Sequence, residues 1–163
     1  LMKIGKKQST PSMLTLESWK SDELKTIEHV APQNPQAKSV FWDRRLYSET
    51  DDFHKVGNLI LLPTEINASA NNKGWKEKFL YYSHLAEKDM DEKAKLAELA
   101  KNNDVILAKS TVDLLEKSAH SHYMEPIITL GIDAKWDKDF VDRRTVRICE
   151  ILWERMEKWL KES

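Results

Sequence analysis

Histidine and asparagine side chains stand at positions where they could support catalysis. Glu28 precedes His29, and His54 and Asn58 follow later in the chain. An imidazole has an ordinary pKa of about 6.5, so it is suited to proton transfer at neutral pH. The structural alternative is that Glu28 and His29 form an ordinary hydrogen-bonded pair, and that Asn58, which follows Gly57, only shapes a turn. The residues alone leave both interpretations open.

A second polar cluster extends from Asn67 to Lys78 with the sequence NASANNKGWKEK. Asn67 either caps a helix backbone or takes part in chemistry. Asn72, Lys73 and Lys78 are either a solvated face or a patch that binds phosphate groups. We assign to packing or surface the three histidines that lack acidic or thiol neighbours at metal-ligand spacing: His84, His120 and His122.

Two short strands are predicted to position these side chains. The segment 25–31 (KTIEHVA) contains Thr, Ile and Val and is closed by Pro32, which predicts a strand with His29 near its end. The apolar run 59–62 follows a Gly-Asn turn dipeptide and stops at Pro63, which is typical of a buried strand. The polar clusters therefore lie at strand ends and loops, where catalytic residues are commonly placed.

Helices are predicted for most of the remaining chain. Thr64 offers an N-cap for a helix after the second strand. The segments 92–103 and 105–119 read as further helices, and Asp139 is the predicted cap of a last helix of about six turns. In that helix apolar side chains recur at steps of three and four, and we expect the whole stripe to pack in the core: Val141, Thr145, Ile148, Leu152, Met156 and Trp159.

The composition indicates one soluble globular domain. The 163 residues are 40% hydrophobic, which is enough for one core. Lys plus Arg (26) and Asp plus Glu (27) nearly cancel to a net charge of -1, so any contact with nucleic acid must use a local patch. No segment approaches the roughly 18 apolar residues of a membrane span. The single Cys149 excludes an intrachain disulfide, so we expect a cytoplasmic protein that makes no membrane contact.

One linker and one domain are expected. Residues 1–15 show little periodicity and are predicted to be a linker or an extension from an upstream domain. Residues 16–163 are predicted to form the domain, with a core at 25–83 and a helical part at 84–163. Because Leu1 precedes Met2, we expect the chain to be a piece of a longer protein.

Three motifs follow one another along the chain. They are Ile27-Glu28-His29-Val30-x-Pro32-Gln33, then His54-x-x-Gly57-Asn58-Leu59-x-Leu61-Leu62, then Asn67, Asn72-Lys73 and Lys78. In this order they resemble the C-terminal nuclease domain of GmrSD-type modification-dependent restriction enzymes, which is related to the HNH (His-Me finger) nucleases. The tail is similar as well, so the resemblance covers roughly residues 25–160: Trp136, Val141, Arg144, Leu152 and Trp153.

The resemblance implies a role for each matched residue. His29 takes the position of the general base, and Asn58 takes that of the middle asparagine, which fixes the loop that orients the base. Asn67 takes the final metal-binding position, where many HNH enzymes have His. Glu28 stands where many relatives have Asp, and its longer side chain either reaches the metal through water or has another use. His54 is characteristic of this subfamily and either contacts phosphate or makes a structural bond.

Phosphodiester hydrolysis is consistent with these residue types. A water must lose a proton to a base, and a cation beside the phosphate must offset charge on the leaving oxygen. Oxygen ligands from Glu28 and Asn67 suit Mg²⁺ or Mn²⁺, since both ions keep several waters. Two protein ligands and one base imply a one-metal site, with Asn72, Lys73 or Lys78 on the phosphate oxygens.

We therefore expect a predominantly helical α+β fold in which a strand-strand-helix (ββα-metal) HNH core is wrapped by C-terminal helices. The expected function is nicking or double-strand cleavage of DNA in defence against phage. The expected partner is an upstream nucleotide-hydrolysing sensor domain, covalent or separate. Two alternatives are a catalytically inactive module that binds nucleic acid or protein on the same fold, and an RNA-cleaving toxin of the same chemistry. The intact set Glu28, His29, Asn58 and Asn67 counts against the inactive module.

Overall fold

A computed structural model describes residues 26–35, 41–48, 51–118 and 124–162 of the chain. The segment predicted to be a linker falls in residues 1–25, outside these ranges. His120 and His122 also lie outside them.

A two-stranded antiparallel sheet confirms both predicted strands. β1 (Thr26–His29) pairs with β2 (Leu59–Leu62), and the register places His29 opposite Leu59. Alternate residues of β2 are buried, because successive side chains of a strand point to opposite faces. The predicted base therefore lies beside the residue that follows Asn58.

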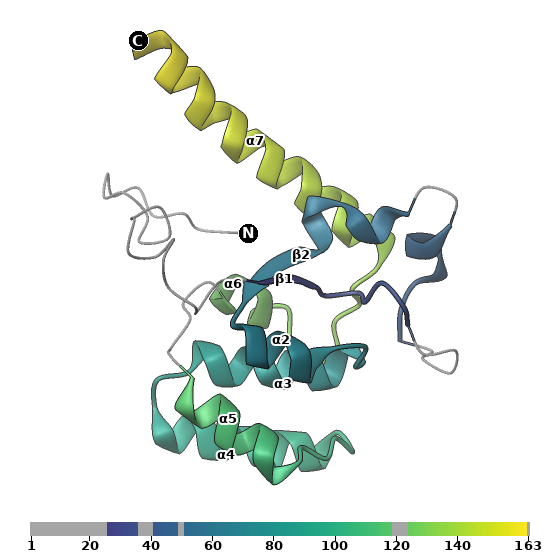
Figure 1. Cartoon of the computed structure of the whole chain (residues 1–163), viewed down its shortest axis with the longest axis vertical. Helices are drawn as coiled ribbons and strands as arrows, with labels where there is room; N and C mark the ends of the chain where they lie inside the picture. The colour runs from purple at the N-terminus through teal and green to yellow at the C-terminus, as the bar shows by residue number, and fades with distance from the viewer. Residues whose placement is uncertain (1–25, 36–40, 49–50, 119–123, 163) are drawn as a thin grey trace.

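Helices make up most of the described chain and agree with the predicted helical α+β class. They are α2 (Thr64–Ala70), α3 (Trp75–Ala86), α4 (Met90–Asn102), α5 (Lys109–Lys117), α6 (Glu125–Ile128) and α7 (Lys138–Glu162). In its described part, the loop between the strands carries three 3-10 turns: η3 (Arg44–Tyr47), η4 (Asp52–His54) and η5 (Val56–Asn58). In Figure 1, α2 and α3 lie on one side of the sheet, α4 and α5 pair beyond α3, and α7 runs outward on the opposite side. Within the described ranges, none of these helices has both the length and the apolar character needed to cross a bilayer.

Four helices start at other residues than the sequence predicts. α4 begins at Met90 where residue 92 is predicted, and α5 begins at Lys109 where residue 105 is predicted. The predicted cap Thr64 is instead the first residue of α2. The predicted cap Asp139 lies inside α7 and pairs with Arg45 at 2.9 Å. Asp137 occupies the capping position, because its carboxylate accepts the N–H of Phe140 at 2.8 Å. These differences shift the start of each helix by at most a few residues and leave its type unchanged.

The apolar stripe of α7 is only partly buried, which corrects the prediction that the whole stripe packs in the core. Val141 is fully buried, whereas Leu152, Met156 and Trp159 are 54%, 51% and 68% exposed. The first turns of α7 pack against η5, and the later turns project beyond the body of the domain (Figure 1). The stripe therefore lies on one face of α7. It is buried near the start of the helix and exposed towards the C-terminal end.

The packing of α7 on the turn before β2 requires a glycine at position 57. A Cβ atom at Gly57 would lie 2.1 Å from the carbonyl oxygen of Val141 and 2.4 Å from the hydroxyl of Thr145. The Gly57 N–H donates to that hydroxyl at 3.0 Å, and the hydroxyl donates to the Val141 carbonyl at 2.8 Å. The missing side chain thus lets the last helix pack directly on the turn that carries Asn58.

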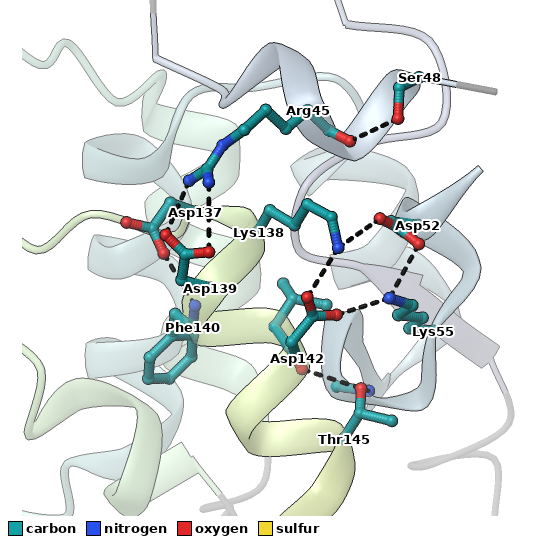
Figure 2. A network of polar contacts seen from close by, with 12 residues as sticks. Arg45, Ser48, Asp52, Lys55, Asp137, Lys138, Asp139, Phe140, Asp142 and Thr145 are labelled. Carbon is teal, nitrogen blue, oxygen red and sulfur yellow. Dashed lines mark hydrogen bonds and ion pairs between the residues drawn. The ribbon is translucent and has the colours of Figure 1, made fainter. Parts of the chain in front are cut away.

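A network of ion pairs attaches the start of α7 to η4 (Figure 2). Lys138 contacts Asp52 and Asp142 at 2.7 Å each, and Lys55 contacts the same carboxylates at 2.9 and 2.6 Å. Exposed ion pairs contribute little singly, but Asp52 is buried and joins both lysines. The network therefore fixes the segment that ends at His54 against the last helix.

Candidate active site

The Asn58 side chain holds the backbone that follows His29. Its Oδ1 accepts the N–H of Ala31 at 2.8 Å, and its Nδ2 donates to the Ala31 carbonyl at 2.8 Å and to the Phe53 carbonyl at 2.7 Å. Oδ1 also accepts the indole N–H of Trp136 at 2.8 Å. Asn58 is fully buried, and its amide oxygen and nitrogen each make two hydrogen bonds. This carboxamide therefore fixes the position of the residues just after His29.

Two residues from the C-terminal part support the same turn. Arg144 Nη1 donates to the carbonyls of Gly57 at 2.5 Å and Leu59 at 3.1 Å, and its guanidinium lies 5.7 Å from the ring centroid of Trp136. Burial lowers the pKa of Arg144 to about 10. From the sequence alone, Trp136 and Arg144 are recognised only as residues of the tail that resembles the family. The structure adds that they hold the backbone around Asn58.

His29 lies at the end of β1 with a half-buried ring beside His54. Its Nε2 lies 3.3 Å from the Nδ1 of His54 and 3.3 Å from the amide nitrogen of Gln33. With the Gln33 amide nitrogen at this position, a hydrogen bond between the two residues requires an Nε2 of His29 that carries no proton. Burial, then the nearness of His54 and Lys78, lowers the pKa of His29 below its ordinary value. The neutral form, which a general base requires, is thus favoured at neutral pH.

Glu28 and Lys78 form a buried ion pair beneath His29. Lys78 Nζ lies 2.5 Å from Glu28 Oε1 and donates to the His29 carbonyl at 2.9 Å. Tyr82 donates to the same Glu28 oxygen at 3.5 Å. Burial raises the pKa of Glu28 and lowers that of Lys78, and their mutual attraction offsets part of both shifts. Lys78 is 0% exposed, so this lysine is covered and lies apart from the surface patch that the sequence suggests.

An open groove between β1 and α2 brings several of the predicted residues together. His29, Glu28, Asn67 and Asn72 line its wall, whereas His54 and Lys73 do not. The other residues that line the groove are uncharged: Thr26, Ile27, Pro32, Gln33, Asn34, Thr64, Ala68 and Asn71. The predicted base and both predicted metal ligands therefore line one groove.

The donors at this groove fit a hard divalent cation. The Asn67 Nδ2 donates to the Ile27 carbonyl at 3.2 Å, so its amide oxygen is the atom available to a ligand. Glu28 Oε1 is held by Lys78, which leaves the second carboxylate oxygen. In the ranges described, no three His, Cys, Asp or Glu residues gather as metal ligands. A site here would thus use one amide oxygen, one carboxylate oxygen and several waters, as Mg²⁺ tolerates.

The sequence matches the family described as GmrSD restriction endonucleases, C-terminal domain, over residues 4–151. The chain belongs to this family. Membership gives it a nuclease role in restriction, with DNA as the implied substrate. No curated protein matches the chain.

Proposed function

We propose that the chain is a metal-dependent endonuclease of the HNH type that nicks or cuts DNA, with β1, β2 and α2 as its ββα-metal core. The observation that carries the proposal is the clamp of Asn58 on Ala31, two residues after His29. This is the part that the resemblance implies for the middle asparagine of an HNH motif. His29 and Asn67 also line one groove, which is what a base and a metal ligand of one site require.

In this proposal His29 takes the proton from the attacking water. The lowered pKa of His29 favours its neutral ring, and the backbone is held by Lys78 at the His29 carbonyl and by Asn58 two residues later at Ala31. Bound Mg²⁺ or Mn²⁺, held by Asn67 with Glu28 nearby, would supply positive charge beside the scissile phosphate. His54 keeps the ring of His29 in place or contacts phosphate.

Asn72 and Lys73 are the proposed contacts to the phosphate backbone. Asn72 lines the groove, and Lys73 is the next residue of the chain. The Lys73 side chain is one-third exposed and forms an ion pair with Glu77. A phosphate group must therefore compete with Glu77 for this ammonium.

Lys73→Ala is expected to weaken DNA binding modestly and to reduce the slope of log affinity against log salt by about one, the effect of one lost phosphate contact. Binding should be measured by fluorescence anisotropy between low and physiological salt. Glu77→Gln is the complementary variant. It removes the ion-pair partner of Lys73, so it should make DNA binding tighter. Equal salt slopes for Lys73→Ala and the parent would show that this lysine does not contact phosphate and belongs to an ordinary solvated face.

Asn67→Ala should weaken Mg²⁺ or Mn²⁺ binding and cleavage together, by roughly 10- to 100-fold in metal affinity, the scale seen when support of a metal site is lost. Titration calorimetry with the metal alone and cleavage at graded metal concentrations are the two measurements. Asn71→Ala is the control, because Asn71 lines the same groove and has no proposed ligand role. A metal-independent parent, or unchanged metal affinity in Asn67→Ala, would contradict the assignment.

One assay separates the proposed function from its alternatives. Supercoiled plasmid and structured RNA are each incubated with the chain, with divalent metal or with a chelator. Metal-dependent cleavage of plasmid supports the proposal. Cleavage of RNA alone identifies a toxin, and no cleavage of either identifies a binding module.

The proposed partner is an upstream nucleotide-hydrolysing sensor domain, covalent or separate, that selects modified DNA. The chain's own net charge is -1, and its groove is lined mostly by neutral side chains. Neither feature supplies strong attraction to DNA or the arginine-guanine contacts of direct base recognition. Selectivity is therefore assigned to the partner.

A further inference from the structure

The ammonium of Lys78 lies where a lysine is rarely found. Lysines are almost never fully buried unless they are paired, because removing an ammonium from water is costly. Lys78 is nonetheless 0% exposed, and its Nζ lies 6.0 Å from the ring centroid of Trp42. A purely apolar side chain of similar volume often stabilises such a position as well or better. The contacts of this ammonium therefore suggest a role beyond stability.

The two partners of Lys78 are consecutive residues of β1. Its Nζ contacts the carboxylate of Glu28 at 2.5 Å and the backbone carbonyl of His29 at 2.9 Å. The β1–β2 register ends at His29, and one more backbone bond follows it, from the Val30 N–H to the Asn58 carbonyl at 3.0 Å. Asn58 holds Ala31 beyond this point. His29 is thus fixed from α3 on one side and from the turn before β2 on the other.

We propose that Lys78 is a positioning residue, whose buried ammonium fixes the His29 carbonyl and the Glu28 carboxylate together so that the imidazole and the second carboxylate oxygen face one groove. It acts through these two residues and touches neither water nor phosphate. This inference rests on the proposed function and deepens it. Lys78 is thus assigned a structural contact to the backbone of the proposed base, in place of the phosphate contact expected from the sequence.

Lys78→Met tests the proposal, because it keeps the length of the side chain and removes the ammonium. We expect kcat for plasmid cleavage to fall about 100-fold, the scale of a displacement of about 1 Å at a reacting group. The KM for DNA and the salt dependence of binding should stay unchanged. Lys76→Met is the matched control on the same helix, since Lys76 contacts Asn103 and Asp133 away from the groove and should keep the parent's kcat.

A second readout does not depend on cleavage. The ¹H–¹³C signal of the His29 ring, assigned with His29→Gln, is recorded without metal or DNA. It should be a single sharp signal in the parent and Lys76→Met, and broadened or doubled in Lys78→Met. If the parent does not cut DNA, the proposed function fails, and this spectrum still decides whether Lys78 positions His29.

Loss of Lys78 alone leaves a buried carboxylate without its partner, so Lys78→Met could unfold. The double variant Glu28→Gln with Lys78→Met removes both charges and is then compared with Glu28→Gln. A His29 signal as sharp in the double variant as in Glu28→Gln would overturn the proposal. So would an unchanged kcat in folded Lys78→Met, or a change confined to KM and salt slope, which would identify a phosphate contact.

Discussion

His29→Ala should reduce cleavage by about 10²- to 10⁴-fold, the usual contribution of a general base. The fold should stay intact, because within the described part of the chain the ring makes polar contacts to His54 and Gln33 alone, both at 3.3 Å. Plasmid cleavage at matched purity, together with the thermal midpoint of each protein, measures both effects. If the lost group is a base, free imidazole added to the variant should restore part of the rate.

His54→Ala is the natural comparison for this experiment. It removes the neighbour of the base but leaves the base itself, so its effect on kcat should be clearly smaller than that of His29→Ala. Equal cleavage by His29→Ala and the parent would exclude the proposed mechanism. Equal losses for the two histidine variants would assign the proton transfer to the pair.

Asn58→Ala should lower the free energy of unfolding by at least about 3 kcal/mol, because each buried donor or acceptor left without a partner costs roughly 1–3 kcal/mol. Four such groups lose their bond: the N–H and carbonyl of Ala31, the carbonyl of Phe53 and the indole N–H of Trp136. Cleavage should fall as well, since the backbone after His29 is released. Urea unfolding and plasmid cleavage well below the thermal midpoint are the measurements.

Asn34→Ala is the matched control for Asn58→Ala. Asn34 is an exposed asparagine at the groove, so its loss should change stability by less than about 0.5 kcal/mol, as is usual for surface substitutions. A loss below about 1 kcal/mol in Asn58→Ala would mean that water replaces the lost bonds. The clamp on Ala31 would then not be what holds this segment.

The strands that position His29 could be predicted because their signals are local. Pro32 closes a segment that contains Thr, Ile and Val, Pro63 closes an apolar run, and both strands form where these signals indicate. The type of each of these elements follows from a few neighbouring residues. Their pairing register, which places His29 beside Leu59, follows only from the folded structure.

The burial of Lys78 could not be predicted from its surroundings in the sequence. The run WKEK reads as a charged helix face, and such a face is normally solvated. In the fold, α3 lies between the sheet and the α4–α5 pair, so most of its residues are covered (Figure 1). Lys78 of this run therefore lies in the core, while the side chain of Lys76, two residues before it, is 36% exposed.

The exposed end of α7 shows a related limit. A repeat of three and four residues identifies one face of a helix, but it does not tell how far the neighbouring elements extend along that face. Here the turn at Gly57 covers Val141 and Thr145, and the domain ends before Met156 and Trp159. The sequence therefore predicted the helix and its apolar face, and only the structure shows where burial stops.

The bond between Asn58 and Trp136 joins residues 78 positions apart and has a consequence for synthesis of the protein. A ribosome releases His29, Asn58 and Asn67 well before it makes Trp136 and Arg144, and domains generally fold as units. Until the last helix emerges, the turn that orders the base lacks its indole donor and the guanidinium on its carbonyls. A growing chain thus carries the proposed catalytic residues before the turn that supports them is complete, so we expect the proposed cleavage activity only once translation of the domain is nearly finished.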